Sequence, residues 1–254
     1  MLPAERRKTI LELIETQSSL SVVELSKVLG VSDMTVRRDL RMLSNSGLLE
    51  RVHGGALSRR GRSYEPPYFI REKESGRHKA LIGQKAATLI QQGDSVALDV
   101  GSTTLELARN MSGIANLSVL TSSLRVTNEL VDSPNIRLIL TGGMVRQQEL
   151  SLIGYIAERT YQEFRVDKAF VGVGGIHVDA GLTEYNLEDA QVKKSLIANA
   201  DQVIVLADSR KLGETCFAYI APLSCVDILV TDADAHPDML ELFRKNGVEV
   251  IIAE

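Results

Sequence analysis

The sequence contains little cysteine, and its two thiols fit no pattern that would use them. Cys216 and Cys225 match neither the ligand spacing of a zinc site nor the framework of a disulfide-stapled domain. A bridge between them stays open, but an isolated pair favours the reduced cytoplasm. We expect no metal and no other cofactor, since ligand spacing is also missing from the four histidines, which are His53, His78, His177 and His236.

Long apolar runs are also missing. No run approaches the roughly 20 residues that a membrane helix needs, so we expect no membrane partner. The basic residues of Met1–Lys8 are not followed by the apolar stretch of a signal peptide. Both absences favour a cytoplasmic protein.

Excess positive charge is absent overall but present locally. The net charge of −4 argues weakly against a nucleic-acid partner. Residues 1–62, however, hold 11 Lys+Arg against 7 Asp+Glu, a net of +4, so the remainder carries −8. A basic head on an acidic body places a polyanion partner at the head. Ordinary surface charge remains the alternative, and charge alone does not decide between them.

Three short helices are predicted in the head. The first covers roughly 4–17. Ser21-Val22-Val23-Glu24 has the S-x-x-E form of a capping box and opens a second helix through Leu29, which Gly30 ends. Ser32 caps a third helix that runs to about Asn45. Two helices joined by a tight glycine turn are typical of a helix-turn-helix.

The third predicted helix has the properties of a recognition helix. Val36, Leu40 and Leu43 form its buried stripe. Side chains in the first turn of such a helix reach base edges in the major groove, and arginines bind phosphates or guanines. A solvated face on a core helix is the alternative, but the adjoining turns favour DNA. The candidate DNA-contacting residues of this helix are Ser32, Asp33, Thr35, Arg37, Arg38 and Arg41.

A hairpin and a linker come after the third helix. Leu48–Val52 reads as a strand, Gly54-Gly55 as its turn and Ala56-Leu57 as the returning strand, which together form a wing. The segment Ser58–Ser63 is polar and basic, and Pro66-Pro67 stiffens the chain beyond it. We therefore expect a winged helix-turn-helix domain, a linker and an effector-sensing domain at residues 3–58, 59–76 and 77–254.

Helical and strand patterns alternate through the remainder of the chain. Strands that read as continuous apolar runs are covered on both faces, and the alternation predicts a doubly wound, largely parallel α/β sheet. Helices are expected at 79–90, 103–110, 124–131, 187–199 and 238–246, and strands at 95–98, 117–120, 136–140, 168–173, 202–207, 225–230 and 248–252.

The head motifs resemble the signature of the DeoR family of bacterial repressors. The resemblance rests on Arg6 or Arg7, on Ser32-x-x-Thr35-Val36-Arg37-Arg38-Asp39-Leu40, and on Arg51-Val52-His53-Gly54-Gly55-Ala56. It implies that Asp39 pairs with a nearby arginine. It also implies that the wing touches DNA through Arg51, His53 and Gly54, although a lone loop histidine is more often simply exposed.

Three predicted strand ends carry hydroxyl- or glycine-rich loops. Asp99-Val100-Gly101-Ser102-Thr103-Thr104 comes directly after a strand and opens a helix, where backbone N–H groups and hydroxyls can hold an anion. The alternative is a simple N-cap. Thr121-Ser122-Ser123 and Thr141-Gly142-Gly143 end two further strands. This set resembles the ligand pocket of the family, and similar loops hold the sugar phosphate in ribose-5-phosphate isomerase, whose fold the sensor resembles.

Further loops add candidates of lower specificity. The candidate effector-binding residues outside those loops are Gly172, Glu188 and Lys211. Lys211 matches the lysine of a D-S-x-K stretch in the family and would neutralise a phosphate; an exposed lysine is the alternative. Gly172–Gly175 is no dinucleotide fingerprint, because no helix opens directly after it.

An isomerase is the competing class of protein. The isomerases that the sensor resembles carry an acidic stretch with the general base, whereas the aligned loop here, Gly172–Ile176, has no acid. We therefore expect no enzyme. The resemblance implies a homodimeric or homotetrameric regulator of a carbohydrate or related catabolic operon that binds operator DNA and a small anionic metabolite, commonly a phosphosugar. It favours repression over activation.

Overall fold

The computed structural model describes residues 1–17, 19–58 and 61–254. These residues form two compact units, Met1–Ile70 and Arg71–Glu254, which we call the head and the sensor. Arg59 and Arg60, which belong to the predicted basic linker, lie outside the described residues. The predicted linker range 59–76 also contains a helix, α4 (Tyr68–Lys73). Ile70 packs into the head core, so part of this range belongs to the head.

The head contains the three predicted helices, and their ends match the local signals. Ser21 accepts a hydrogen bond from the Glu24 N–H while the Glu24 carboxylate accepts one from the Ser21 N–H, which confirms the capping box. Gly30 ends the second helix with a φ of 64°, a left-handed conformation that favours glycine. The helices are α1 (Pro3–Gln17), α2 (Val22–Leu29) and α3 (Asp33–Asn45).

The wing has one more strand than the predicted hairpin. β2 (Glu50–Val52) and β3 (Gly55–Leu57) form the hairpin, and β1 (Ser19–Ser21) pairs with the other side of β3. A Cβ on Gly55 would lie 2.4 Å from the Leu20 carbonyl oxygen, so this pairing requires glycine there. The strand predicted to begin at Leu48 begins later, because the Leu48 N–H still bonds the Leu43 carbonyl at the end of α3.

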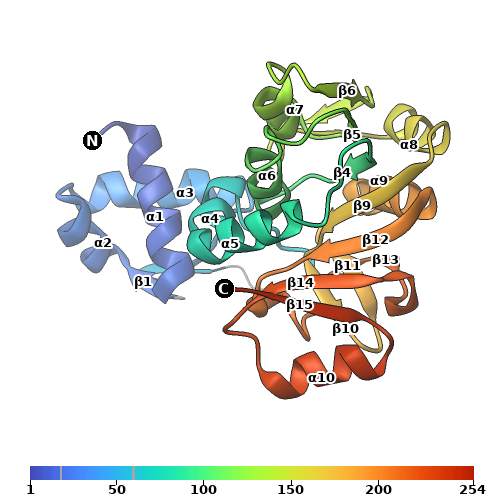
Figure 1. Cartoon of the computed structure of the whole chain (residues 1–254). Coiled ribbons are helices and arrows are strands. Elements are labelled where there is room, and N and C mark those ends of the chain that lie inside the picture. The colour runs from blue at the N-terminus through green and yellow to red at the C-terminus, as the bar shows by residue number, and fades with distance from the viewer. Residues whose placement is uncertain (18, 59–60) are drawn as a thin grey trace. The chain divides into compact units, whose positions relative to one another are not determined.

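The sensor is built on a seven-stranded sheet in which every neighbouring pair is parallel (Figure 1). Its order is β15-β14-β12-β9-β4-β5-β6. The chain moves outward from β4 in one direction and from β9 in the other, so the sheet is doubly wound as predicted. The strands are β4 (Ser95–Leu98), β5 (Leu117–Thr121), β6 (Ile136–Leu140), β9 (Val166–Gly172), β12 (Ala200–Leu206), β14 (Ile228–Asp232) and β15 (Glu249–Ala253).

Helices cover both faces of this sheet. Figure 1 shows α5, α6 and α7 on one side and α8 and α9 on the other. A buried hydrophobic cluster joins residues of α8, α9 and α10 to the sheet. Gly83 brings α5 against α6, since a Cβ there would lie 2.5 Å from the Glu106 carbonyl carbon. The helices are α5 (Gly76–Ala87), α6 (Ser102–Arg109), α7 (Leu124–Leu130), α8 (Tyr155–Gln162), α9 (Leu187–Ala198) and α10 (Pro237–Lys245).

Some elements depart from the prediction. The strand predicted at 225–230 is β14 at Ile228–Asp232, because Pro222 begins a short 3₁₀ turn, Leu223–Cys225, whose N–H groups bond locally. Elements that were not predicted from the sequence are α8, the hairpin β7 (Met144–Arg146) and β8 (Ser151–Ile153), and a small antiparallel sheet of β10 (Gly175–His177), β11 (Gly181–Glu184) and β13 (Ala218–Ala221). No helix in the described part of the chain combines the length and apolar character of a membrane span.

Candidate functional site

Helix α3 turns its arginines away from the head core. Val36, Leu40 and Leu43 are buried, while Arg37, Arg38 and Arg41 are exposed. Ser32 and Asp33 are exposed in the first turn and Thr35 is half-buried. Ser32 accepts a hydrogen bond from the Thr35 N–H at 3.4 Å, so it caps the helix as predicted. The predicted DNA-contacting residues of this helix therefore share one accessible surface.

Asp39 is the charged residue of α3 that faces inward. Its carboxylate lies 2.6 Å from Nε of Arg6, and the side chains of Arg6 and Asp39 are 11% and 5% exposed. Arg7 lies farther away, with Nε 4.0 Å from the carboxylate, and its Nε donates to the Pro3 carbonyl at 3.1 Å. The predicted pairing of Asp39 with an arginine is confirmed. This ion pair fixes the start of α1 against α3.

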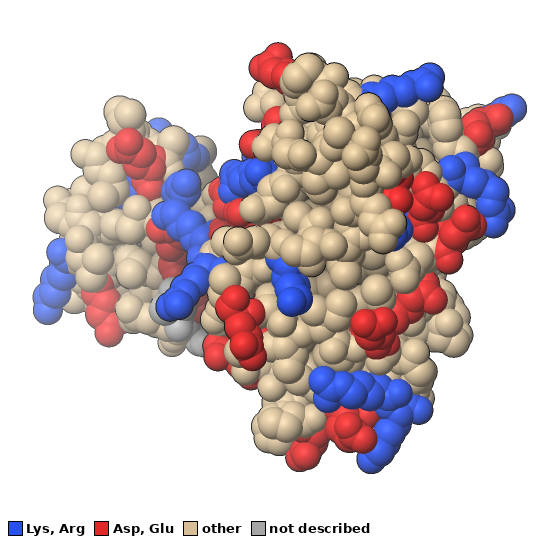
Figure 2. Space-filling view, viewed as in Figure 1, with Lys and Arg blue, Asp and Glu red and all other residues tan. Residues whose placement is uncertain are grey.

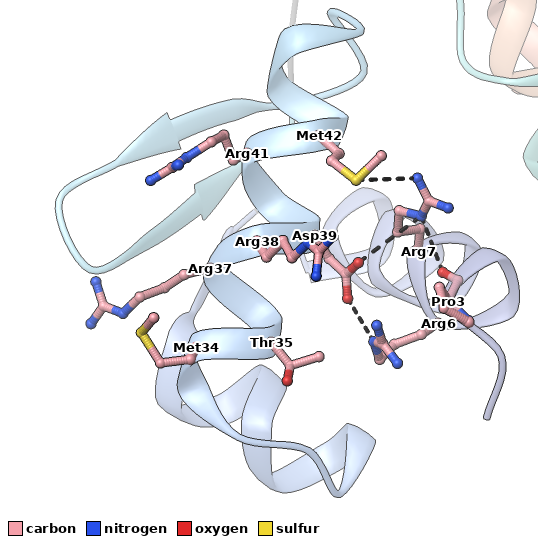
Figure 3. A pocket seen from close by; sticks show the side chains of 10 residues that line it. All are labelled: Pro3, Arg6, Arg7, Met34, Thr35, Arg37, Arg38, Asp39, Arg41 and Met42. Atoms are coloured by element: carbon pink, nitrogen blue, oxygen red, sulfur yellow. Dashed lines mark hydrogen bonds and ion pairs between the residues drawn. The ribbon is translucent and has the colours of Figure 1, made fainter.

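A groove of about 760 Å³ runs between the start of α1 and α3 (Figure 3). Arginines are the most frequent residue type in its lining, so it is an electropositive surface. Apolar side chains also contribute, and Met34 stands beside Arg37 (Figure 3). The lining residues are Pro3, Arg6, Arg7, Met34, Thr35, Arg37, Arg38, Asp39, Arg41 and Met42.

The wing also presents its predicted residues to solvent. Arg51, His53 and Gly54 are exposed, and Gly54 has a φ of 86°. On the face seen in Figure 2, lysine and arginine side chains are interspersed with aspartate and glutamate on both units. The arginines of α3 are therefore set apart by their shared helix face rather than by net charge.

In the sensor, the predicted ligand loops lie at one edge of the sheet. Because β4, β5, β6, β9 and β12 are parallel, the loops after them all leave from the carboxyl edge. The residues that this topology brings to the edge are Asp99, Gly101, Ser102, Thr103, Thr104, Thr121, Ser122, Thr141, Gly142, Gly143, Gly172 and Lys211.

Several hydroxyl groups of these loops are used internally. Thr121 Oγ1 donates to the Leu98 carbonyl at 2.7 Å, and Thr104 Oγ1 donates to the Gly101 carbonyl at 3.0 Å. Thr141 Oγ1 donates to the Gly142 carbonyl at 3.1 Å. These three hydroxyls hold the loops in shape, and any ligand contact they make comes in addition to that role.

The start of α6 differs from that of α7 or α9. Ser123 caps α7 and Asn186 caps α9 through side-chain oxygens. The N-cap of α6 is Gly101, which has no side chain and a φ of 128°. No side chain caps the first N–H groups of α6, at Ser102 and Thr103, which lie at the positive end of the helix dipole; both residues are buried, at 7% and 9% exposed.

A buried ion cluster lies beside these loops. Lys193 of α9 pairs with Asp99, approaches Glu184 at 3.2 Å and donates to the Gly172 carbonyl at 2.8 Å. Asp99 in turn accepts from the Gly172 N–H at 2.9 Å. Burial raises the pKa of Asp99 to about 6 against the opposing charge of Lys193. Although burial alone would lower it, the pKa of Lys193 is raised by Asp99 and Glu184.

A second group of charges surrounds Asp208, after β12. Burial and the like charges of neighbouring cations lower the pKa of Lys79 to about 8, despite Asp208. Burial also lowers the pKa of Lys211, whose ammonium donates to the Tyr185 hydroxyl at 2.7 Å. Arg210 binds Asp208 at 2.9 Å and Glu74 at 3.1 Å. Lys79, Lys211 and Arg210 still outnumber these two carboxylates, so the group would attract an added anion.

Glu188 is the predicted sensor residue that does not join these groups. It is exposed in the first turn of α9, whereas its neighbour Asp189 is buried and pairs with Arg146 at 2.5 Å. Lys193, Glu184, Asp189 and Lys79 were missed from the sequence. The signal for Lys193 was its spacing from Ala190 and Ile197, which places a lysine inside the apolar stripe of its own helix.

The two units together define a class of protein. A head with exposed arginines on a recognition helix is joined to an α/β domain with polar loops at one sheet edge. The models of two protein domains match the chain: the DeoR-like helix-turn-helix domain over residues 6–61 and the DeoR C terminal sensor domain over residues 74–233. The chain belongs to the DeoR family of DNA-binding transcriptional regulators.

Curated relatives match over the full length of the chain. It is 33% identical to the HTH-type transcriptional regulator GolR of Listeria innocua over 254 residues, which covers 100% of both chains. It is 36% identical to the regulator GlpR of Haloferax volcanii over 99% of this chain and 98% of that protein. It is 34% identical to the transcriptional repressor GlcR of Bacillus subtilis over 100% and 98%.

Solved structures resemble parts of the chain only distantly. The ribose-5-phosphate isomerase A of Methanocaldococcus jannaschii matches with a TM-score of 0.39 and 18% identity over 52% of each chain. The Pyrococcus horikoshii translation initiation factor eIF-2B matches with the same TM-score and identity over 85% of this chain and 69% of that one. These values are too low to support an argument about chemistry.

Proposed function

We infer that the protein represses a carbohydrate or related catabolic operon and releases its operator when a small anionic metabolite, most simply a phosphosugar, binds the sensor. The observation that carries the effector site of this proposal is the uncapped start of α6 at the carboxyl edge of the sheet; the regulator itself rests on the family match. The name of the Bacillus subtilis relative, a repressor, supports repression over activation.

The operator would be read by α3 and the wing. Arg37, Arg38 and Arg41 are exposed and long enough to reach guanine edges or phosphates, with Ser32, Asp33 and Thr35 at the end of the helix that enters the groove. Arg51, His53 and Gly54 would contact the DNA backbone at the wing.

The test is the operator affinity of Arg37→Ala and Arg38→Ala in the full chain. A lost phosphate contact lowers the slope of affinity against salt by about one, and a lost base contact costs about 1–3 kcal/mol and relaxes specificity at one position. Lys27→Ala, on α2, is the control. Full affinity in the double variant R37A/R38A would remove both arginines from the interface.

The effector phosphate would bind at the start of α6. There the N–H groups of Ser102 and Thr103 meet the positive end of the helix dipole, and their hydroxyls can donate as well. Gly142 and Gly143, after Thr141, allow the next loop to approach closely, since both have positive φ values of 76° and 115°. Thr121, Ser122 and Gly172 would shape the floor.

The cation group around Asp208 would hold a second anionic or hydroxyl-bearing part of the effector. Lys211 and Lys79 have lowered pKa values, which an added anion would relieve. Thermal-shift screening of phosphorylated sugars and sugar acids against the full chain would identify the compound. A set that gives no shift with any anion would contradict the proposal.

Regulation without catalysis is the better interpretation of the sensor. Sugar isomerisation needs a carboxylate positioned to take a proton from the substrate. Asp99 is held by Lys193 and the Gly172 N–H, and the Gly172–Ile176 loop has no acid. Turnover of the effector into a product, monitored by NMR, would contradict this interpretation.

Two copies of the chain would act together. One winged domain offers too small an interface for genomic specificity, so we expect a paired operator and self-association through the sensor, as a dimer or tetramer. Footprinting of a single half-site that a monomer binds tightly would contradict this.

A further inference from the structure

One apolar side chain stands on the surface that the arginines of α3 share. Met34 is 76% exposed, which makes it the most exposed large hydrophobic residue in the described part of the chain. It lines the electropositive groove together with Arg37 and Arg38. No packing inside the head accounts for it, because its side chain is mostly in water.

Met34 lies on the face of α3 that points away from the head core. Met34, Arg38 and Arg41 are spaced i, i+4 and i+7, so they share a helix face. The buried stripe of Val36 and Leu40 lies on the opposite side. Figure 3 shows Met34 extending from the first turn of α3 with Arg37 beside it. On a helix that enters the major groove, this first turn is the part that meets base edges.

The chemistry of Met34 limits what it can recognise there. A thioether on a flexible, apolar stem offers no hydrogen-bond donor, so it cannot read guanine oxygens or carry a phosphate. The apolar group that B-DNA presents in the major groove is the C5-methyl of thymine. Burying that methyl against Met34 removes apolar surface of both partners from water.

We propose that Met34 reads the C5-methyl group of a thymine in each operator half-site. The inference rests on the proposed operator binding. It adds a methyl contact to the arginine contacts, and it predicts that part of the specificity of this protein is hydrophobic.

The test begins with operators selected from random duplexes by the full-length wild-type chain, by Met34→Ala and by Met42→Ala. Met42 is the matched control: it is also an exposed methionine of α3, but it lies in the last turns, with its sulfur 3.6 Å from Arg7. We expect the wild type and M42A to select a thymine at one position of each half-site, and M34A to select no base there.

The second step replaces that thymine by deoxyuridine, which pairs identically and lacks only the methyl group. Loss of one buried methyl group corresponds to about fourfold in affinity per half-site, or about fifteenfold for a paired site. Wild type and M42A should show this loss, whereas M34A should bind the thymine and deoxyuridine operators equally.

Two results would overturn the inference while leaving operator binding intact. In the first, wild type and M34A lose the same affinity when deoxyuridine replaces thymine. In the second, wild type and M34A select the same operator, with no thymine position that M34A loses. Selection of no sequence at all by the wild type would instead contradict the proposed operator binding itself. The two failures are thus distinguishable in one experiment.

Discussion

The ion pair between Arg6 and Asp39 makes a sharp prediction about the stability of the head. Arg6→Ala leaves the Asp39 carboxylate, 5% exposed, with the more distant Arg7 as its cationic neighbour in the described part of the head. Breaking a buried pair by removing one partner typically costs about 3–5 kcal/mol, and the remaining Arg7 should keep this case near the lower end. A unit of about 70 residues has a total stability of only about 4–10 kcal/mol, so the loss is large.

Hydrogen exchange of the full-length chain measures this loss locally. Amides in the middle of α1 and α3 should exchange about 100-fold faster or more in R6A, while those of the sensor sheet, such as β9 and β12, keep wild-type rates. Arg7→Ala is the control, because Arg7 is 4.0 Å from the carboxylate and 29% exposed. It should change exchange far less.

A double variant distinguishes the loss of attraction between Arg6 and Asp39 from the cost of burying the Asp39 carboxylate without a partner. R6M together with Asp39→Leu removes both charges and should recover much of the stability, since no buried carboxylate remains. Unchanged head exchange in R6A would refute the reasoning, because it would show that the carboxylate needs no partner from α1.

Three further predictions concern the sensor. Ser102→Ala combined with Thr103→Val should give a repressor that keeps its fold but needs far more effector for release. Effector binding typically lowers operator affinity 5- to 150-fold, so titration of the operator complex with effector will resolve the change. Anion binding near Lys79 should raise the pKa of Lys79 from about 8. Calorimetry at pH 8 in buffers of different ionisation enthalpy should therefore show that anion binding takes up about half a proton, and the anion affinity should fall as the pH rises. Lys79→Met should abolish this proton uptake. Gly83→Ala should lower the free energy of unfolding of the sensor, measured in urea, by about 1–3 kcal/mol, because the added Cβ would lie 2.5 Å from the α6 backbone. An unchanged urea midpoint would show that α5 and α6 can move apart without cost.

The parts of the fold that depend on neighbours in sequence were predictable. The capping box at Ser21–Glu24, the left-handed Gly30 and the Ser32 cap are local features, and each is present as predicted. Strand β1 was not, because three residues show no periodicity and its partner β3 is distant in sequence. The alternation of apolar strands with helices was enough to predict the parallel sheet.

The candidate sites were predictable to different degrees. Exposed arginines on α3 can be inferred from helix periodicity alone, since the buried stripe fixes the opposite face. The buried ions are harder to predict, because lysines usually face solvent; Lys193 carries a signal in the apolar stripe of α9, but nothing local predicts its partner. Lys193 reaches Asp99 across 94 positions of sequence, and only the sheet topology brings the two together. The phase of α9 leaves the predicted Glu188 exposed and buries Asp189 instead.

The close approach of α1 to α3 has a practical consequence for anyone handling this protein. Pro3 lines the same groove as Arg38, and the Leu2 N–H is held by the Glu5 carboxylate at 3.0 Å. A purification tag or fluorescent partner fused before Met1 would therefore emerge beside α3, the helix that we propose reads the operator. Affinity measurements should therefore use the untagged chain.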